Sequence, residues 1–371
     1  MIIKKISFEN FRNLKNDEIE PCETINVIYG DNAQGKTNIL EALWMFCGGH
    51  SFRGTKDKEL IQFGKDFAKL NVTFFSQNRE QTAQIIFKAG KRDVVINGVK
   101  KPSTSALIGR YTAVIFSPED LTLIKRGPSG RRRFIDSAIC REKLQNAVLI
   151  SKYNQTLSQR NALIKDIYRH PELKSTIDIW DDTLSILGTD IIMQRLDYVK
   201  KLTKYSKQYH LGISDEKENL EVNYISSFDF EEGIDRQKMF ETFSKALKKS
   251  REEDYKTGYT NVGPHRDDFD IIINGKKAKI FASQGQQRSA VLSLKLAEAH
   301  ILREQTGENP SILLDDVLSE LDVKRQDFLL NKISDYQVFI TCCQLDEREQ
   351  IKTGKSFYIK DGAPKALSSC R

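Results

Sequence analysis

Two segments at opposite ends of the chain constrain its fold more than any other feature. Residues 30–37 read GDNAQGKT, which is a complete phosphate-binding loop. The apolar run Ile312–Leu314 is followed by Asp315 and Asp316, as in a strand that delivers carboxylates to a metal ion. A nucleotide site that uses both segments requires the two ends of the chain to fold together. The residues between them must then form an insertion.

The glycine-rich loop predicts a site for a nucleotide phosphate chain. Its two glycines permit a tight turn whose backbone N–H groups point at phosphate oxygens. We expect Lys36 to reach the β- and γ-phosphates and the Thr37 hydroxyl to bind Mg²⁺. An incidental surface turn is the alternative, but the apolar run 25–29 before the loop and the helical spacing after it favour the site. The residues expected to contact the nucleotide here are Gly30, Asp31, Asn32, Ala33, Gln34, Gly35, Lys36, Thr37 and Asn38.

The two acids near the C-terminus are interpreted together with this loop. Ligands of open α/β sheets bind at the carboxyl ends of the strands, where Asp315 and Asp316 would lie. We expect Asp315 to hold Mg²⁺ with Thr37, and Asp316 to orient or deprotonate the attacking water. Without the loop, a capped strand end would explain the two acids equally well.

The pattern of elements predicts an α/β fold with an insertion. Hairpin turns at Asn97-Gly98 and Asn274-Gly275 indicate paired strands, and alternating strands and helices in the last third indicate a parallel sheet. The middle is predicted to be mainly helical, with amphipathic helices of at most about 30 residues. The expected organisation is an ATPase lobe with a mixed sheet from residues 1–129 and 257–371, and an inserted helical lobe from residues 130–256.

Composition adds only broad limits. The 371 residues carry a formal net charge of +7, which is compatible with an anionic partner and does not establish one. The six cysteines have no zinc-site spacing. We expect a cytoplasmic protein without a membrane partner, since no signal peptide and no membrane-length apolar run are evident.

A third segment, residues 283–288, stands directly before a well-patterned helix. A serine and a glycine at a helix N-terminus can bind an anion through free N–H groups and a hydroxyl. An N-cap serine and a loop glycine without any ligand explain Ser283 and Gly285 equally well. The residues themselves leave these two interpretations open.

In this order and spacing, the three segments resemble the ABC-type ATPases of the SMC family. The resemblance makes Ser283, Gly285 and Gln286 a signature motif that contacts ATP held by a second subunit. It makes residues 319–322 a D-loop at the dimer interface. It also places Thr341 where a switch histidine often lies, and Arg12 near the nucleotide. Two subunits are therefore expected to enclose two ATP molecules with Mg²⁺.

Within that group, the chain is most similar to the RecF family of bacterial DNA replication and repair ATPases. Five segments spread over the chain carry this similarity: FENFRNL at 8–14, FSPEDL at 116–121, RRRFID at 131–136, GPHRDD at 263–268 and SQGQQR at 283–288. The resemblance implies ATP-dependent dimerisation on double-stranded DNA and at single-strand/double-strand junctions. It also implies mediator partners of the RecO and RecR type, which help load the recombinase onto single-stranded DNA.

Three positions depart from the wider pattern. The second acid is Asp316 where glutamate is more usual, so the base would lie farther from the water and we expect slow hydrolysis. Gln284 replaces one signature glycine. The Q-loop position has no glutamine, and Glu119 or Asp120 is the candidate replacement.

Other interpretations remain at this point. The arginines at 131–133 suit either an acid-paired face or a DNA contact. The charged residues of 263–268, His265 and Arg266 among them, suit a salt-bridged connection, a hinge between the lobes or a DNA contact. A transporter nucleotide-binding subunit is one alternative function, but it would have a Q-loop glutamine and a fuller signature. A scaffold that binds ATP without hydrolysing it is another, because Asp316 is short.

Overall fold

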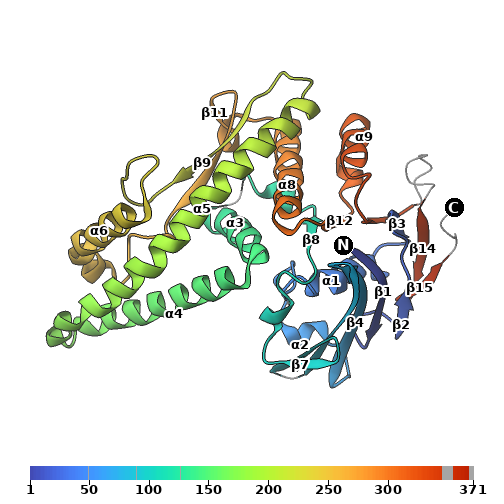
Figure 1. Cartoon of the computed structure of the whole chain (residues 1–371), viewed down its shortest axis with the longest axis horizontal. Coiled ribbons are helices and arrows are strands. Elements are labelled where there is room, and N and C mark those ends of the chain that lie inside the picture. The colour runs from blue at the N-terminus through green and yellow to red at the C-terminus, as the bar shows by residue number, and fades with distance from the viewer. Residues whose placement is uncertain (49, 89, 126, 345–353, 367–371) are drawn as a thin grey trace. The chain divides into compact units, whose positions relative to one another are not determined.

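The computed structural model describes residues 1–366 except 49, 89, 126 and 345–353. Contacts between Cα atoms divide the chain into two compact units (Figure 1). Unit 1 contains residues 1–122, 208–217 and the chain from Gln284 onward. Unit 2 contains residues 123–207 and 218–283. Both ends of the chain therefore belong to unit 1, as the separated motifs predict.

An antiparallel sheet forms one layer of unit 1. Each neighbouring pair of its six strands is antiparallel, and the Asn97-Gly98 turn joins the last two. In sheet order the strands are β2 (Asp17–Ile19), β1 (Ile2–Glu9), β4 (Phe67–Ser76), β5 (Arg79–Lys88), β6 (Lys91–Ile96) and β7 (Val99–Lys101).

A second sheet of unit 1 is parallel except at one edge. In sheet order its strands are β15 (Ala363–Ala366), β14 (Lys355–Lys360), β3 (Ile25–Tyr29), β13 (Val338–Cys342), β12 (Ser311–Asp315) and β8 (Ala113–Phe116). Only β15 runs antiparallel to its neighbour. The strand before the phosphate loop, β3, lies between two strands from the C-terminal part of the chain. The α/β fold class is confirmed.

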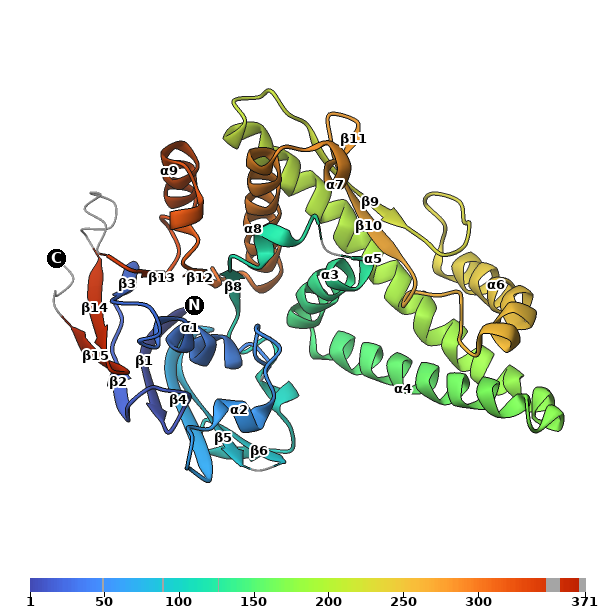
Figure 2. The same cartoon turned by 180° about the vertical axis from the view of Figure 1, so that it is seen from behind.

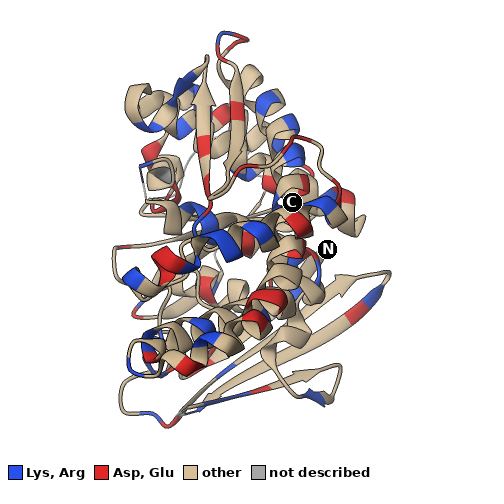
Figure 3. Cartoon of the chain, turned by 90° about the vertical axis from the view of Figure 1, so that its left-hand side faces the viewer, with Lys and Arg blue, Asp and Glu red and all other residues tan. Residues whose placement is uncertain are grey.

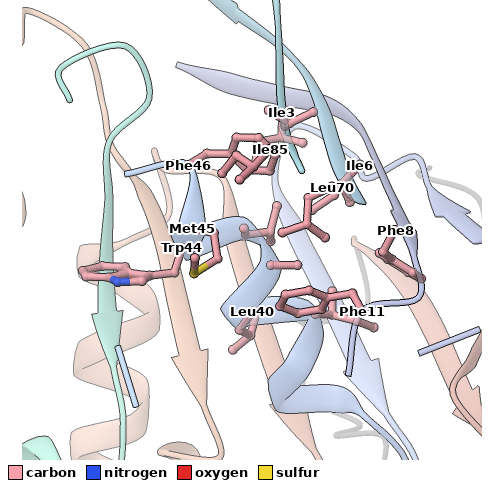
Figure 4. Close-up of a cluster of buried hydrophobic side chains, with 14 of the residues drawn as sticks. Ile3, Ile6, Phe8, Phe11, Leu40, Trp44, Met45, Phe46, Leu70 and Ile85 are labelled. Carbon is pink, nitrogen blue, oxygen red and sulfur yellow. The ribbon is translucent and has the colours of Figure 1, made fainter. Parts of the chain in front are cut away.

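Helices cover both faces of the parallel sheet, so its strands are buried on both sides. Leu313 and Phe339 point into a cluster that contains α1 and the antiparallel sheet. Leu314 and Ile340 point the other way, into a cluster with α8 and α9. Figure 4 shows side chains of α1 among those of β1, β4 and β5. The unit 1 helices are α1 (Lys36–Met45), α2 (Asp57–Leu60), η1 (Thr104–Leu107), η2 (Asp120–Thr122), α8 (Gln284–Thr306), η4 (Leu318–Glu320) and α9 (Val323–Lys332).

Unit 2 is mainly helical and also contains a small antiparallel sheet (Figure 2). Its helices are α3 (Pro128–Glu142), α4 (Leu144–Ile167), η3 (Pro171–Thr176), most of α5 (Ile177–Ile213), α6 (Arg236–Thr257) and α7 (Ala278–Phe281). Its strands, in sheet order, are β11 (Lys276–Lys277), β10 (Asp268–Ile273) and β9 (Leu220–Ile225).

Three features of the middle region differ from the sequence-based expectations. Helix α5 has 37 residues, beyond the expected limit of about 30, and no proline interrupts it. Strand β9 lies in a segment that we predicted to be helical. The sequence of this segment does not reveal the strand, because its pairing partner β10 is distant along the chain. That pairing holds residues 257–283 in unit 2, whereas we expected them in the ATPase lobe.

Candidate nucleotide site

The phosphate loop has the backbone geometry that its sequence predicts. Strand β3 leads into it and α1 begins directly after it. Three residues of the loop have positive φ angles: +144° at Gly30, +65° at Ala33 and +108° at Gly35. The angles at residues 30 and 35 favour glycine, which has no Cβ. Lys36 is 8% exposed, and its Nζ donates to the carbonyl oxygens of Gly30 at 2.6 Å and Asp31 at 2.9 Å. The ammonium group therefore lies within the loop that it would share with phosphate.

Residues from both chain ends hold the loop. A Cβ on Gly30 would lie 2.4 Å from the carbonyl oxygen of Ile359 in β14, so no side chain fits there. Asn13 donates from Nδ2 to the Ala33 carbonyl at 2.9 Å and accepts from Asn38 at 2.7 Å. The Asp361 N–H donates to Gln34 Oε1 at 2.6 Å. Asn13 was not among the predicted site residues, although it lies in the FENFRNL segment.

The structure brings Thr37 and Asp315 together although 278 positions separate them. The Thr37 hydroxyl donates to Asp315 Oδ1 at 2.7 Å, and the Thr341 hydroxyl lies 3.0 Å from the same oxygen. Burial raises the pKa of Asp315, while the hydrogen bonds from Thr37 and Thr341 oppose that rise. A hydroxyl and a carboxylate are oxygen donors of the kind that Mg²⁺ takes together with phosphate. These residues therefore fit the expected ion.

Thr341 also fixes the second acid. The Asp316 N–H donates to Thr341 Oγ1 at 2.9 Å, and Asp316 has a φ of +54°, which is uncommon outside glycine. Asp316 and Thr341 line the same cavity as the phosphate loop. One threonine thus orients both acids.

Arg12 lines that cavity, but protein groups already hold its guanidinium. It donates to both carboxylate oxygens of fully buried Glu41, at 2.8 and 2.9 Å, and to Thr55 Oγ1 at 2.7 Å. In this arrangement Arg12 fastens residues 55–59 to α1. The sequence resemblance alone did not indicate this role.

The cavity has a volume of about 950 Å³ and a mixed lining. The phosphate loop, Asp316 and Thr341 contribute to its lining. Arg53 and residues 58, 59 and 61–66 also line it. Such a volume lies within the range typical of sites for small ligands and cofactors.

The signature segment lies partly inside a helix. Helix α8 begins at Gln284, so Gly285 and Gln286 belong to its first turn, whereas we expected the segment to stand before the helix. Neither residue is among the described residues that line the cavity of unit 1. Ser283, exposed at the end of unit 2, immediately precedes the helix.

The start of α8 is bonded to the expected D-loop. Arg288 Nη2 donates to Glu320 Oε2 at 2.8 Å, and its Nη1 donates to the Glu320 carbonyl at 2.5 Å. Arg325 Nε donates to Ser289 Oγ at 2.7 Å, and the Arg325 guanidinium borders Gly285. The two segments expected at a dimer interface therefore form one bonded group.

Asp120, one of the two Q-loop candidates, is committed to local contacts. Its Oδ2 accepts from the Ser117 N–H at 2.9 Å, and its Oδ1 lies 3.2 Å from Lys295 Nζ. Glu119 is exposed. The Q-loop role of either residue stays a prediction.

In unit 2 the two arginine-containing motifs contact each other. Arg131 is 6% exposed and forms a two-point ion pair with Asp268, with Nε to Oδ1 at 2.9 Å. Arg132 donates to the Asp267 carbonyl at 2.8 Å. Arg133 and Arg266 are exposed. The acid-paired interpretation holds for Arg131, and a DNA contact stays open for the two exposed arginines.

Charge alone does not single out a DNA-binding face. Lys and Arg segments are interspersed with Asp and Glu segments along the chain (Figure 3). Within the part of the chain that the structure describes, no helix is long and apolar enough to cross a membrane.

Comparisons with known proteins agree with this geometry. Residues 2–362 match the family model described as RecF/RecN/SMC N terminal domain. The chain is 41% identical to a DNA replication and repair protein RecF of Acetivibrio thermocellus over 97% of its own length and 98% of that protein. It is 42% identical to the RecF of Agathobacter rectalis, covering 98% of each chain.

Solved structures give the same result. A structure described as the recombination mediator protein RecF with ATP, in the RecFOR pathway, matches with a TM-score of 0.93 and 39% identity, covering 99% of this chain and 98% of that one. An SMC head domain of Pyrococcus furiosus matches with a TM-score of 0.56 and 16% identity, which supports the fold alone. Because the family model and the full-length relatives cover almost the whole chain, this protein belongs to the RecF family.

Proposed function

We propose that this chain binds ATP with Mg²⁺, hydrolyses it slowly and uses ATP binding to dimerise on DNA during recombinational repair. One observation carries the proposal: the Thr37 hydroxyl and the Asp315 carboxylate, 2.7 Å apart, join the two distant motifs beside one cavity. The solved relative described with ATP supports ATP as the nucleotide, and the relatives named DNA replication and repair protein RecF support a role in repair. Membership of the RecF family argues against a transporter subunit.

In the proposed reaction, Lys36 and the loop N–H groups bind the β- and γ-phosphates. Magnesium held by Thr37 and Asp315 would neutralise charge on the phosphate oxygens. Asp316 orients a water molecule and accepts its proton as the water oxygen bonds to the γ-phosphorus. The bond from that phosphorus to the ADP oxygen breaks, and ADP and phosphate leave. The short Asp316 side chain is the reason to expect slow turnover.

The dimer is proposed to complete each site across two subunits. Gly285 and Gln286 do not line the cavity of their own unit, and the SMC-type resemblance assigns them with Ser283 to the partner's ATP. Hydrolysis would then reopen the dimer. The proposed DNA ligands are double-stranded DNA and single-strand/double-strand junctions, and the proposed partners are mediators of the RecO and RecR type, in keeping with the RecFOR pathway named for the solved relatives.

The test measures ATP turnover and ATP-dependent dimerisation by light scattering, without DNA and with single-stranded, double-stranded and junction DNA. Lys36→Ala should lose ATP binding, whereas the exposed control Lys91→Ala should keep it. Ser283→Arg should bind ATP and stay monomeric. Asp316→Asn should prolong the dimer. Tight ATP binding by Lys36→Ala would refute the site, and a wild-type protein that dimerises without any turnover would favour the non-hydrolysing scaffold.

A further inference from the structure

Phe63 is an aromatic side chain whose exposure the fold itself does not explain. Its relative exposure is 103%, although phenylalanine is usually buried. Single exposed apolar residues are common on protein surfaces, so exposure alone carries no conclusion. Phe63 differs from such residues in its location, because it lines the cavity that also contains the phosphate loop.

The lining of that cavity is mixed. The phosphate loop contributes Lys36 and Thr37, Asp316 also lines it, and further charged residues come from Arg53 and from the segment that carries Phe63, namely Lys58, Glu59, Lys65 and Asp66. Among the described residues that line the cavity, Phe63 is the sole aromatic, and Ile61 adjoins it two positions earlier. A nucleotide likewise combines a charged phosphate chain with a flat aromatic base, which Phe63 could contact.

The turn that carries Phe63 is firmly anchored. Leu60 is fully buried and Ile61 packs against the core of unit 1. The Gln62 N–H donates to the Asn10 carbonyl at 2.8 Å, and the Lys65 N–H closes the turn onto the Gln62 carbonyl at 3.0 Å. Gly64 has a φ of +77°, which this turn requires of it. The backbone beneath Phe63 is therefore fixed while its ring is free of protein contacts that would bury it.

The same short segment fixes the turn and the phosphate loop. Arg12 N–H donates to the Leu60 carbonyl at 2.8 Å, and Asn13 Nδ2 donates to the Ala33 carbonyl at 2.9 Å. The distance between the turn and the loop is thus set by residues 10–13. A ligand that contacts both the turn and the phosphate loop would meet them in a preformed arrangement, which reduces the ordering cost of binding.

We propose that Phe63 is the base-contacting residue of this site and stacks on the purine ring of the bound nucleotide. The inference rests on the proposed function, since it assumes that the phosphate loop holds the phosphate chain. Stacking of a base on an aromatic side chain strengthens binding by about tenfold or more. Phe63 and the phosphate loop belong to the same unit of one chain, so this stacking contact does not require a second subunit.

The test compares ATP and ADP with inorganic tripolyphosphate, which has the phosphate chain and no base, by calorimetry on the full-length protein. Phe63→Ala should weaken ATP and ADP about tenfold and leave tripolyphosphate unchanged. Phe63→Trp should restore the affinity, and its fluorescence should be quenched by ATP and not by tripolyphosphate. Tyr168→Ala removes a ring that is 91% exposed and does not line the cavity, so it is the matched control and should change nothing.

Several results would overturn the inference. Unchanged ATP affinity in Phe63→Ala would do so. An equal loss of affinity for ATP and for tripolyphosphate would also do so, because it would mean that the turn shapes the phosphate site. A loss for ATP without one for ADP would assign Phe63 to the dimer interface instead. Wild-type protein that binds tripolyphosphate as tightly as ATP would exclude a base subsite and leave the phosphate site intact. Wild-type protein that binds none of the three ligands would refute the proposed function itself.

Discussion

Thr341 offers a sharp test of how the two acids are held. Its hydroxyl accepts the hydrogen bond from the Asp316 N–H and is one of two hydroxyls bonded to Asp315 Oδ1. Thr341→Val keeps the shape of this buried side chain, which is 1% exposed, and removes the hydroxyl. An orphaned N–H costs about 1–3 kcal/mol, and the lost bond to a carboxylate costs a similar amount. Because the two losses share one group, we expect about 2–4 kcal/mol less stability in total.

The substitution should also weaken Mg²⁺-dependent nucleotide binding. The hydrogen bond from Thr341 lowers the pKa of Asp315, so its loss adds to the rise that burial already causes. A metal ligand must be deprotonated, and the defect should therefore grow as the pH falls. Loss of a group that orients a ligand typically reduces metal affinity by about 10–100-fold.

Urea unfolding measures the stability change, and a Mg²⁺ titration at constant ATP, at two pH values, measures the binding change. Thr341→Ser is the matched control, because it retains the hydroxyl and loses only a methyl group. Equal Mg²⁺ affinities for the valine and serine variants would refute the reasoning. So would a defect that does not depend on pH.

Two further predictions concern unit 2. Arg160 is fully buried and donates to Asp181 at 2.6 Å and Asp254 at 2.8 Å, so Arg160→Met should cost about 3–5 kcal/mol in urea unfolding, whereas exposed Arg133→Met should cost under about 0.5. Burial, assisted by nearby arginines, lowers the pKa of His265 in the folded protein to about 4. Because the unfolded chain takes up this proton near pH 6.5, the free energy of unfolding should be unaffected above pH 6.5 and should fall as the pH drops toward 4, by at most about 3 kcal/mol. His265→Gln should flatten that dependence, and an unchanged profile of unfolding midpoints against pH would contradict the assignment.

The sequence predicts the phosphate loop and the acid pair well because each is a local pattern with a local cause. Glycines at fixed spacing determine the loop, and an apolar run ending in Asp315 determines a buried strand with a polar end. That both belong to one site follows from chemistry alone, since each motif is incomplete without the other. In the structure the Thr37 hydroxyl donates to the Asp315 carboxylate, so the two motifs do lie together.

The remaining features depend on contacts between distant residues. Strand β9 has weak local signals and is stabilised by pairing with β10, so the division of the chain near residue 283 could not be placed from the sequence. Asn13 and Phe63 belong to no phosphate-binding pattern, and their positions follow from how the chain folds around the loop. Arg12 was predicted from resemblance, while its bonds to Glu41 arise from the packing of α1.

The position of β3 has a consequence for the order of events during synthesis. Both of its sheet neighbours, β13 and β14, and the Ile359 carbonyl beneath Gly30 come from the last tenth of the chain. At about 5–20 residues per second, a ribosome needs on the order of tens of seconds to make them after β3 has emerged. During that time β3 is an unpaired apolar strand, of the kind that chaperones bind. A chain whose synthesis ends shortly before β13 would contain the whole phosphate-loop sequence but would lack both strands that pair with β3 beside the nucleotide site.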